Sequence, residues 1–208
     1  MLEQVLDKLL WLGHSAFIYE GEPLIYFDPF ALQLLRPADI ILVSHDHPHH
    51  CSPVDIDKVR RAHTVILTDA HAARHIAAPV IALAPGEQET VGGFLIEAVP
   101  AYNLHMSFHP QRQAYLGFIV TLEGLRLYYA GDTDFIPEMR DLRVDIALLP
   151  ISGFNVMGAA EAAQAALALH PQVAIPMHYG TEYGTLEDAE RFRALLDGKV
   201  RVEILAKS

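Results

Sequence analysis

Three apolar runs with the composition of buried β-strands each end in a side chain that can bind a metal ion. The run DIILVSH ends in His45, LRLYYAGD ends in Asp132, and VAIPMH ends in His178. Strands that end at one edge of a sheet deliver the side chains that follow them to one place. A single strand that stops at a polar residue is common, but three that stop at His, Asp and His indicate a site at that edge.

Short β-type runs recur along the whole chain, and amphipathic segments lie between and after them. Ser52 and Pro53 stand at the N-cap and first position of one expected helix, and Thr185 caps another. The segment TLEGLRL predicts a hairpin that turns at Gly124. Strand clusters in both halves predict two sheets packed face to face with helices outside. The expected helices fall within residues 52–63, 158–171 and 185–198.

The composition describes one globular domain. With 51% apolar and 20% charged residues over 208 positions, and no linker or low-complexity break, we expect a single domain over residues 1–208. The formal charge of −11 repels nucleic acid and anionic membranes, so neither is an expected partner.

Cys51 is the only cysteine, which excludes an internal disulfide and a thiolate metal cage. The first residues carry Glu3, Asp7 and Lys8 and lack the long apolar core of a signal peptide or membrane span. A cytoplasmic location is therefore the default expectation.

The segment SHDHPHHCS concentrates four histidines, His45, His47, His49 and His50, within six residues. Alternate side chains beyond a strand can project to one side, so His45 and His47 can share one ion, and His49 and His50 can face a second position. Imidazole suits zinc, iron, manganese or nickel, and a carboxylate such as Asp132 can bridge two ions.

These residues resemble a known family. SHDHPHH is similar to the His-x-His-x-Asp-His signature of the metallo-β-lactamase superfamily, and FHP, YYAGDTD and IPMHYG follow in that family's order. WLGHSAF, YFDPF, PAYN and LLPISG resemble its L-ascorbate-6-phosphate lactonase-like branch. The resemblance covers about Leu10 to Gly180 and implies an α/β (α+β) fold of the four-layer αββα sandwich type.

The resemblance also implies a ligand set for one or two divalent ions. One ion would be held by His45, His47 and His109, and the other by His50 and His178, with Asp132 as the bridge. Zinc or manganese is the expected metal, with iron and nickel as alternatives. His105 lies four residues before His109 and could close the site instead, although the family's His-Pro pair favours His109.

One position departs from the family pattern, because His49 stands where the signature has Asp. An imidazole can still ligate the second ion, but it lacks the negative charge of the carboxylate. Alternatively, His49 turns outward and leaves one ion only. The proton acceptor in catalysis would then be Asp132, His49 or the nearby His105.

Further side chains are expected near the site without ligating an ion. Asp28 would orient a ligand imidazole, and His14 follows a glycine on the first strand. The expected neighbours of ligands or substrate are Asp28, His14, Asn103, Asp134 and Tyr179.

The implied reaction is metal-assisted hydrolysis, in which an activated water attacks an ester, lactone or phosphoester bond. The expected substrate is a small molecule, either phosphorylated or a lactone. The alternatives are a phosphodiesterase or nuclease, a di-iron oxidoreductase, and a metal-binding relative with weak or no catalysis. A homo-oligomer is left open.

Overall fold

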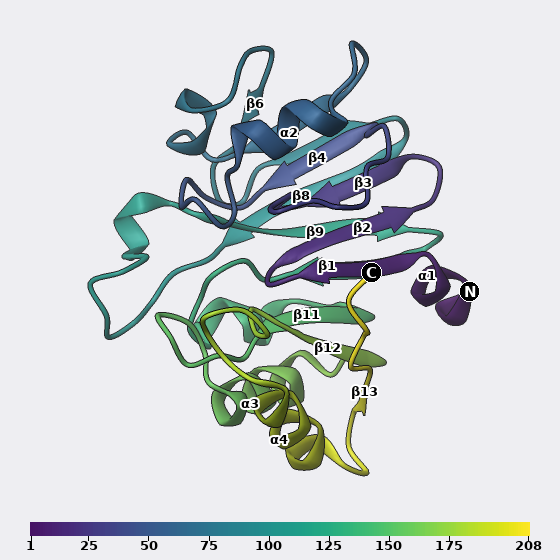
Figure 1. Ribbon diagram of the computed structural model, residues 1–208. Coiled ribbons are helices and arrows are strands. Elements are labelled where there is room, and N and C mark those ends of the chain that lie inside the picture. The colour runs from purple at the N-terminus through teal and green to yellow at the C-terminus, as the bar shows by residue number, and fades with distance from the viewer.

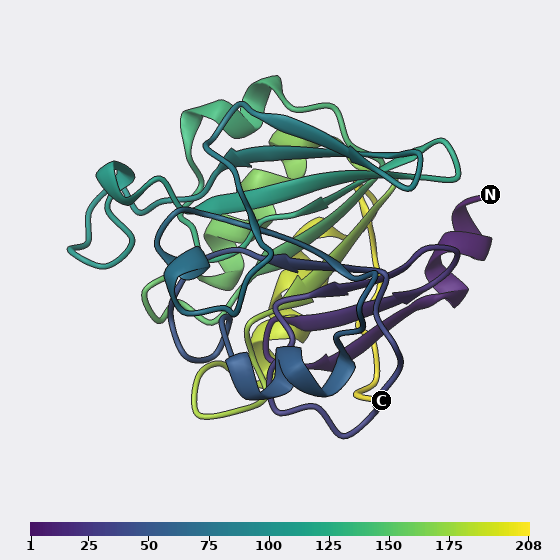
Figure 2. The same ribbon diagram turned by 90° about the horizontal axis from the view of Figure 1, so that it is seen from above.

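The computed structural model describes residues 1–208 and has two β-sheets packed face to face between helices (Figures 1 and 2). The first sheet has the strand order β1 (Leu9–Gly13), β2 (Ala16–Glu20), β3 (Leu24–Phe27), β4 (Ile40–Val43), β5 (Val65–Thr68) and β6 (Ile81–Ala82). The second has the order β13 (Arg201–Val202), β12 (Val173–Met177), β11 (Ile146–Pro150), β10 (Leu125–Tyr129), β9 (Leu116–Leu122), β8 (Phe94–Pro100) and β7 (Gln88–Val91). The predicted four-layer sandwich is confirmed.

Helices form the outer layers. In Figure 1, α2 covers the first sheet, and α3 and α4 cover the second. The helices are α1 (Leu2–Asp7), α2 (Pro53–Val59), α3 (Ala159–Leu169) and α4 (Leu186–Leu196), with 3-10 turns at Ala72–Arg74, Gln111–Gln113 and Pro137–Asp141. None of the helices is both long and apolar enough to cross a bilayer.

The strand β4 shows how the layers arise from the sequence. All four of its residues are buried, because alternate side chains enter different cores on the two faces of the sheet. Ile40 and Leu42 join the large core between the sheets, and Ile41 and Val43 join a smaller core under α2. An uninterrupted apolar run is therefore what this strand requires.

The predicted caps and the predicted hairpin are present. The Ser52 side chain accepts a hydrogen bond from Asp55 N, and Thr185 forms a capping box with Asp188. The β9–β10 hairpin turns through Glu123 and Gly124, whose φ values are 51° and 82°. Two consecutive positive φ values match the twist of the paired strands. The short helix α1 was not predicted, because it has a single buried residue, Val5.

The strand directions place the site. The neighbours β3, β4, β5 and β6 are parallel to one another, and so are β10, β11, β12 and β13. In each parallel set the carboxyl ends reach the same edge, and the residues that follow them meet there.

Candidate metal centre

The candidate site lies where the carboxyl edges of the two sheets meet. Leu116 N donates to Ser44 O at 3.0 Å, which joins the end of β4 to the start of β9. Gly131 follows β10 with φ 64°, and a Cβ there would lie 2.7 Å from Leu116 O. Glycine therefore allows the loop that carries Asp132 to approach the loop that carries His45.

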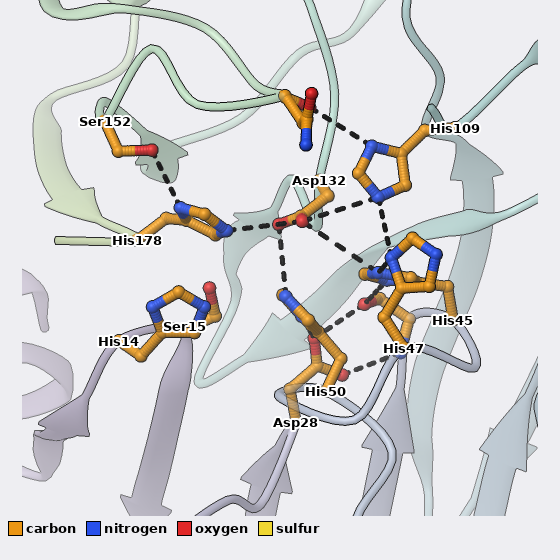
Figure 3. A network of polar contacts seen from close by, with 12 residues as sticks. His14, Ser15, Asp28, His45, His47, His50, His109, Asp132, Ser152 and His178 are labelled. Carbon is orange, nitrogen blue, oxygen red and sulfur yellow. Dashed lines mark hydrogen bonds and ion pairs between the residues drawn. The ribbon is translucent and has the colours of Figure 1, made fainter. Parts of the chain in front are cut away.

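Three imidazoles converge on one point at this edge (Figure 3). His47 Nδ1 lies 3.1 Å from His45 Nε2 and 3.0 Å from His109 Nε2. A neutral imidazole carries one N–H, so the single ring of His47 cannot satisfy both neighbours with well-aligned hydrogen bonds. Three nitrogens this close form a set of lone pairs suited to one metal ion.

Asp132 stands at the centre of the cluster and faces both sides of it (Figure 3). Its Oδ2 lies 3.6 Å from His109 Nε2 and 3.3 Å from His178 Nε2. Its Oδ1 lies 3.3 Å from His50 Nε2, yet this buried oxygen accepts no hydrogen bond. A buried carboxylate with an unsatisfied oxygen between imidazoles fits a shared metal ligand.

A second group of imidazoles lies on the other side of Asp132. His14, His50 and His178 each offer a nitrogen within 4.8 Å of the others, and all three are buried. His50 and His178 were expected here. His14 was expected only as a neighbour of the site, and the hydrogen-bond network shows that its Nε2 is buried without a partner.

Outer hydrogen bonds fix the rings, so that one nitrogen of each ring is turned toward the cluster. Asp28 Oδ2 lies 2.6 Å from His50 Nδ1, as the sequence suggested, and Ser152 Oγ lies 2.9 Å from His178 Nδ1. Ser44 Oγ lies 2.9 Å from His45 Nδ1, and His109 Nδ1 lies 3.1 Å from Asn155 O. Partners of this kind set the tautomer and orientation of metal-binding histidines.

Several of these hydrogen-bond partners were not predicted from the sequence. Ser44 directly precedes the histidine motif, and Ser152 lies in LLPISG, a segment that carries the family resemblance. The sequence positions of both serines therefore indicated that they lie near the site. Asn155 contributes a backbone oxygen, which no side-chain pattern reveals.

Burial and charge set the protonation of the cluster. Burial, together with neighbouring histidines, lowers the pKa of His14 to about 2, and burial lowers that of His109 to about 4. Burial also holds the pKa of His45 well below its usual range. These rings are neutral, which metal binding requires.

His50 and Asp132 form the exception. Burial disfavours charge on His50, but Asp132 and Asp28 more than offset it and raise the pKa of His50 to about 10. Burial likewise opposes ionisation of Asp132, and His178 and His50 outweigh it, so the pKa of this carboxyl lies well below its usual range.

Two expected catalytic residues lie outside the cluster. The His49 side chain is 37% exposed, and its Nε2 faces Glu182 Oε1 at 3.9 Å instead of the other imidazoles. Its position on the outer side of the turn corresponds to the outward alternative. His105 is exposed on the loop between β8 and β9, which projects on the left of Figure 1, and only His109 of that pair enters the site.

The remaining expected neighbours have structural contacts. Asp134 Oδ2 accepts from Leu104 N and anchors the projecting loop, and Asn103 donates to Asn155 O beside His109. Tyr179 is buried and stacks on Trp11 at 4.7 Å, so it packs behind the site and does not line its mouth. Cys51 is buried and free, as expected.

A pocket of about 220 Å³ opens over the cluster. His47, His50, His109, Asp132 and His178 form part of its lining. Its walls include three aromatic side chains, Phe108, Phe154 and Tyr183, and the last two stack at 4.1 Å. His49 lines this pocket as well, although it stands apart from the ligand groups.

The sandwich fold and the cluster of histidines at its edge define a class of protein, and comparison with family models identifies the same class. The model of the family described as "Beta-lactamase superfamily domain" matches residues 8–178. That range contains every member of the two imidazole groups and Asp132.

Comparison with individual proteins identifies the family within this superfamily. The chain is 34% identical to a UPF0173 metal-dependent hydrolase of Pyrococcus abyssi, with 95% of this chain and 96% of the relative covered. A UPF0173 metal-dependent hydrolase of Thermococcus kodakarensis is also 34% identical, with the same coverage. A crystal structure from Parabacteroides distasonis matches with a TM-score of 0.83 and 32% identity, covering 95% of this chain and 91% of that one. The chain therefore belongs to the beta-lactamase superfamily and, within it, to the UPF0173 metal-dependent hydrolase family.

Proposed function

We propose that this protein is a hydrolase that uses divalent metal ions to cleave an ester or lactone bond in a small, uncharged molecule. The proposal is carried by the convergence of imidazole nitrogens and the Asp132 carboxylate on the floor of one pocket. The names of the UPF0173 relatives support the reaction class.

The donor set fits a pair of divalent ions. His45, His47 and His109 would hold one ion, His50 and His178 would contribute to the other, and the unsatisfied Asp132 carboxylate faces both places. Nitrogen-rich donors favour zinc, with manganese, iron and nickel as the alternatives. Such ions supply an activated water and polarise the oxygen of the bond that breaks.

The side chains of this chain supply the rest of the chemistry. Asp132 stays ionised and provides the negative charge that two neighbouring cations require. His49 lines the pocket, and its only ring contact with the two imidazole groups is the edge of His14, with centroids 5.3 Å apart, which leaves its nitrogens available to pass a proton to the leaving oxygen. Glu182, 3.9 Å away and exposed, connects His49 to solvent.

The pocket walls favour an uncharged substrate over a phosphorylated one. None of the 11 lining residues is Lys or Arg, the side chains that usually bind phosphate oxygens. Phe108, Phe154 and Tyr183 instead offer apolar and aromatic surface, which suits a flat ring or acyl group. An L-ascorbate-6-phosphate-type lactone is thus the less favoured member of the lactone class.

The other parts of the proposal rest on the sequence. The formal charge of −11 argues against nucleic acid as a substrate and against an anionic membrane as a partner. A cytoplasmic location is also proposed, and the free thiol of Cys51 is compatible with a reducing compartment.

A substrate panel tests the proposal. The zinc-loaded protein should hydrolyse uncharged aryl esters and γ-lactones with a kcat/KM at least tenfold above that for phosphate monoesters and bis(p-nitrophenyl) phosphate. Faster cleavage of the phosphodiester would favour the phosphodiesterase alternative. Fully bound metal without turnover of any substrate would favour a non-catalytic relative.

A further inference from the structure

His14 is a buried imidazole whose position is fixed by the backbone. It is 2% exposed and follows β1 with φ 53°. Its carbonyl oxygen accepts from Trp11 Nε1 and from His178 N, both at 2.9 Å. The two loops that carry His14 and His178 are thus joined directly, and Figure 3 shows the two rings side by side.

The two ring nitrogens of His14 have different surroundings. Nδ1 lies 3.3 Å from Thr181 Oγ1, whereas Nε2 is buried and has no partner. A buried polar atom without a hydrogen bond costs roughly 1–3 kcal/mol, so an unmet nitrogen in such a place indicates a missing partner. The backbone contacts of His14 involve only its carbonyl oxygen. They therefore do not explain why a buried imidazole with an unpaired nitrogen occupies this position.

The neighbours of that nitrogen are ligand candidates. The ring centroids of His14 and His178 are 4.1 Å apart, and one nitrogen from each of His14, His50 and His178 lies within 4.8 Å of the others. Nitrogens bound to one zinc ion at about 2.0–2.1 Å stand roughly 3.3 Å apart in a tetrahedral site. Binding would require ring rotations that bring the three nitrogens to that spacing. Asp132 Oδ1, 3.3 Å from His50 Nε2, would be the fourth donor.

His49 does not compete for this place. Its ring centroid is 5.3 Å from that of His14, on the side toward Phe30 and Glu182, and more than a third of its side chain is exposed. The side chain at the family's carboxylate position therefore lies at the exposed rim of the pocket and outside the ligand groups.

We infer that His14 replaces the missing motif carboxylate as a ligand of the second ion, which is then bound by His14, His50, His178 and Asp132. The inference rests on the proposed function, since it assumes that the cluster binds metal. It also predicts a preference of the second place for zinc over manganese, because the imidazole of His14 takes the place of one carboxylate and leaves Asp132 as the only oxygen donor from the protein.

Metal stoichiometry of the full chain tests the inference. Asn tolerates the left-handed backbone of residue 14, and its short amide ends well before the position of Nε2. His14→Asn, His49→Asn and the wild type are stripped with chelator, reloaded with excess zinc, desalted and measured by mass spectrometry for ions per chain. His170→Asn is the matched control, because His170 is an exposed histidine with φ 49° at the end of α3.

The expected result is two ions in the wild type, His49→Asn and His170→Asn, and one ion in His14→Asn. Two ions in His14→Asn would overturn the inference. One ion in His49→Asn would overturn it as well, because His49 would then be a ligand of the second ion. A wild type with one ion would also overturn it while leaving the first ion of the proposed function intact. A wild type with no ion would overturn both.

Circular dichroism and thermal unfolding separate a lost ligand from a lost fold. The metal-free His14→Asn variant should have the wild-type spectrum. X-ray absorption at the zinc edge gives a readout independent of stoichiometry, and the average number of imidazoles per zinc in the wild type should be about three. An average of about 2.5, the value for three imidazoles at the first ion and two at the second, would contradict ligation by His14.

Discussion

Asp28 Oδ2 contacts His50 Nδ1 at 2.6 Å, and the same oxygen accepts from Ser44 Oγ and Tyr129 Oη, each at 2.6 Å. One buried carboxylate from the first sheet thereby orients a ligand candidate, the loop of the histidine motif, and a tyrosine of the second sheet. This oxygen holds the Nδ1 side of the His50 ring, while Nε2 faces Asp132 Oδ1 at 3.3 Å.

Asp28→Asn should weaken metal binding by about 10–100-fold, because an amide cannot replace the carboxylate that holds the His50 ring. Isothermal titration of the metal-free protein with zinc measures the change. Asp145→Asn is a matched control, since Asp145 accepts from Arg126 N at the opposite end of the strands. Equal affinities in Asp28→Asn and the wild type would show that the contact is only structural.

Asp132→Ala should reduce zinc-dependent hydrolysis to background and lower the metal content below one ion per chain, because both imidazole groups face this carboxylate. His45→Ala should remove the first ion and the activity while the second ion is retained in part. Metal analysis alongside the activity assay checks both variants. Unchanged stoichiometry and activity in both would refute the site assignment.

His49→Asp restores the family's carboxylate and should tighten the second ion by about tenfold, which corresponds to ~1.4 kcal/mol. The added negative charge lies beside the group formed by His14, His50 and His178. Competition between zinc and a chelator of known affinity gives the constant for each ion. An unaltered second constant would mean that position 49 does not reach the ion in either form.

His49→Asn should lower kcat by about 10²-fold with metal content unchanged, because the proposed role of His49 is proton transfer and not ligation. Single-turnover assays with two leaving groups of different basicity provide the measurement. The loss should be larger for the more basic leaving group, which needs the proton most. An equal loss for both would contradict the assigned role.

The metal-free protein should be most stable near neutral pH. The folded pKa of His50, about 10, lies above its unfolded value of ~6.5, so its contribution is complete below pH ~6.5 and is lost as pH rises through 10. The folded pKa of His109, about 4, lies below the unfolded value, so its contribution is lost as pH falls from ~6.5 toward 4.

Thermal unfolding of chelator-treated protein across this pH range provides the check. His50→Gln removes the group responsible for the alkaline side and should flatten the fall of Tm between pH 7 and 10. An identical alkaline fall in His50→Gln and the wild type would assign that slope to other groups.

The fold and much of the site were predictable from local patterns. The alternating cores on either side of β4 follow from its apolar run, and the ends of β4, β10 and β12 lead directly to His45, Asp132 and His178. That the three strand ends share one edge depends on strand direction, which the family resemblance implied and which short sequence patterns do not give.

The role of His14 was not predictable in the same way. Its partners His50 and His178 lie 36 and 164 residues away in the sequence, and only the folded backbone shows that its Nε2 lacks a hydrogen bond. The outward turn of His49 is equally a tertiary feature, since it depends on Phe30 and Glu182 from distant loops.

Anomalous diffraction from crystals of the zinc-loaded protein locates each bound ion. Two peaks about 3.5–4 Å apart are expected, one among His45, His47 and His109 and the other among His14, His50 and His178, with Asp132 between them. A single peak, or a second zinc bound by His49 with the His14 ring turned away, would contradict this arrangement.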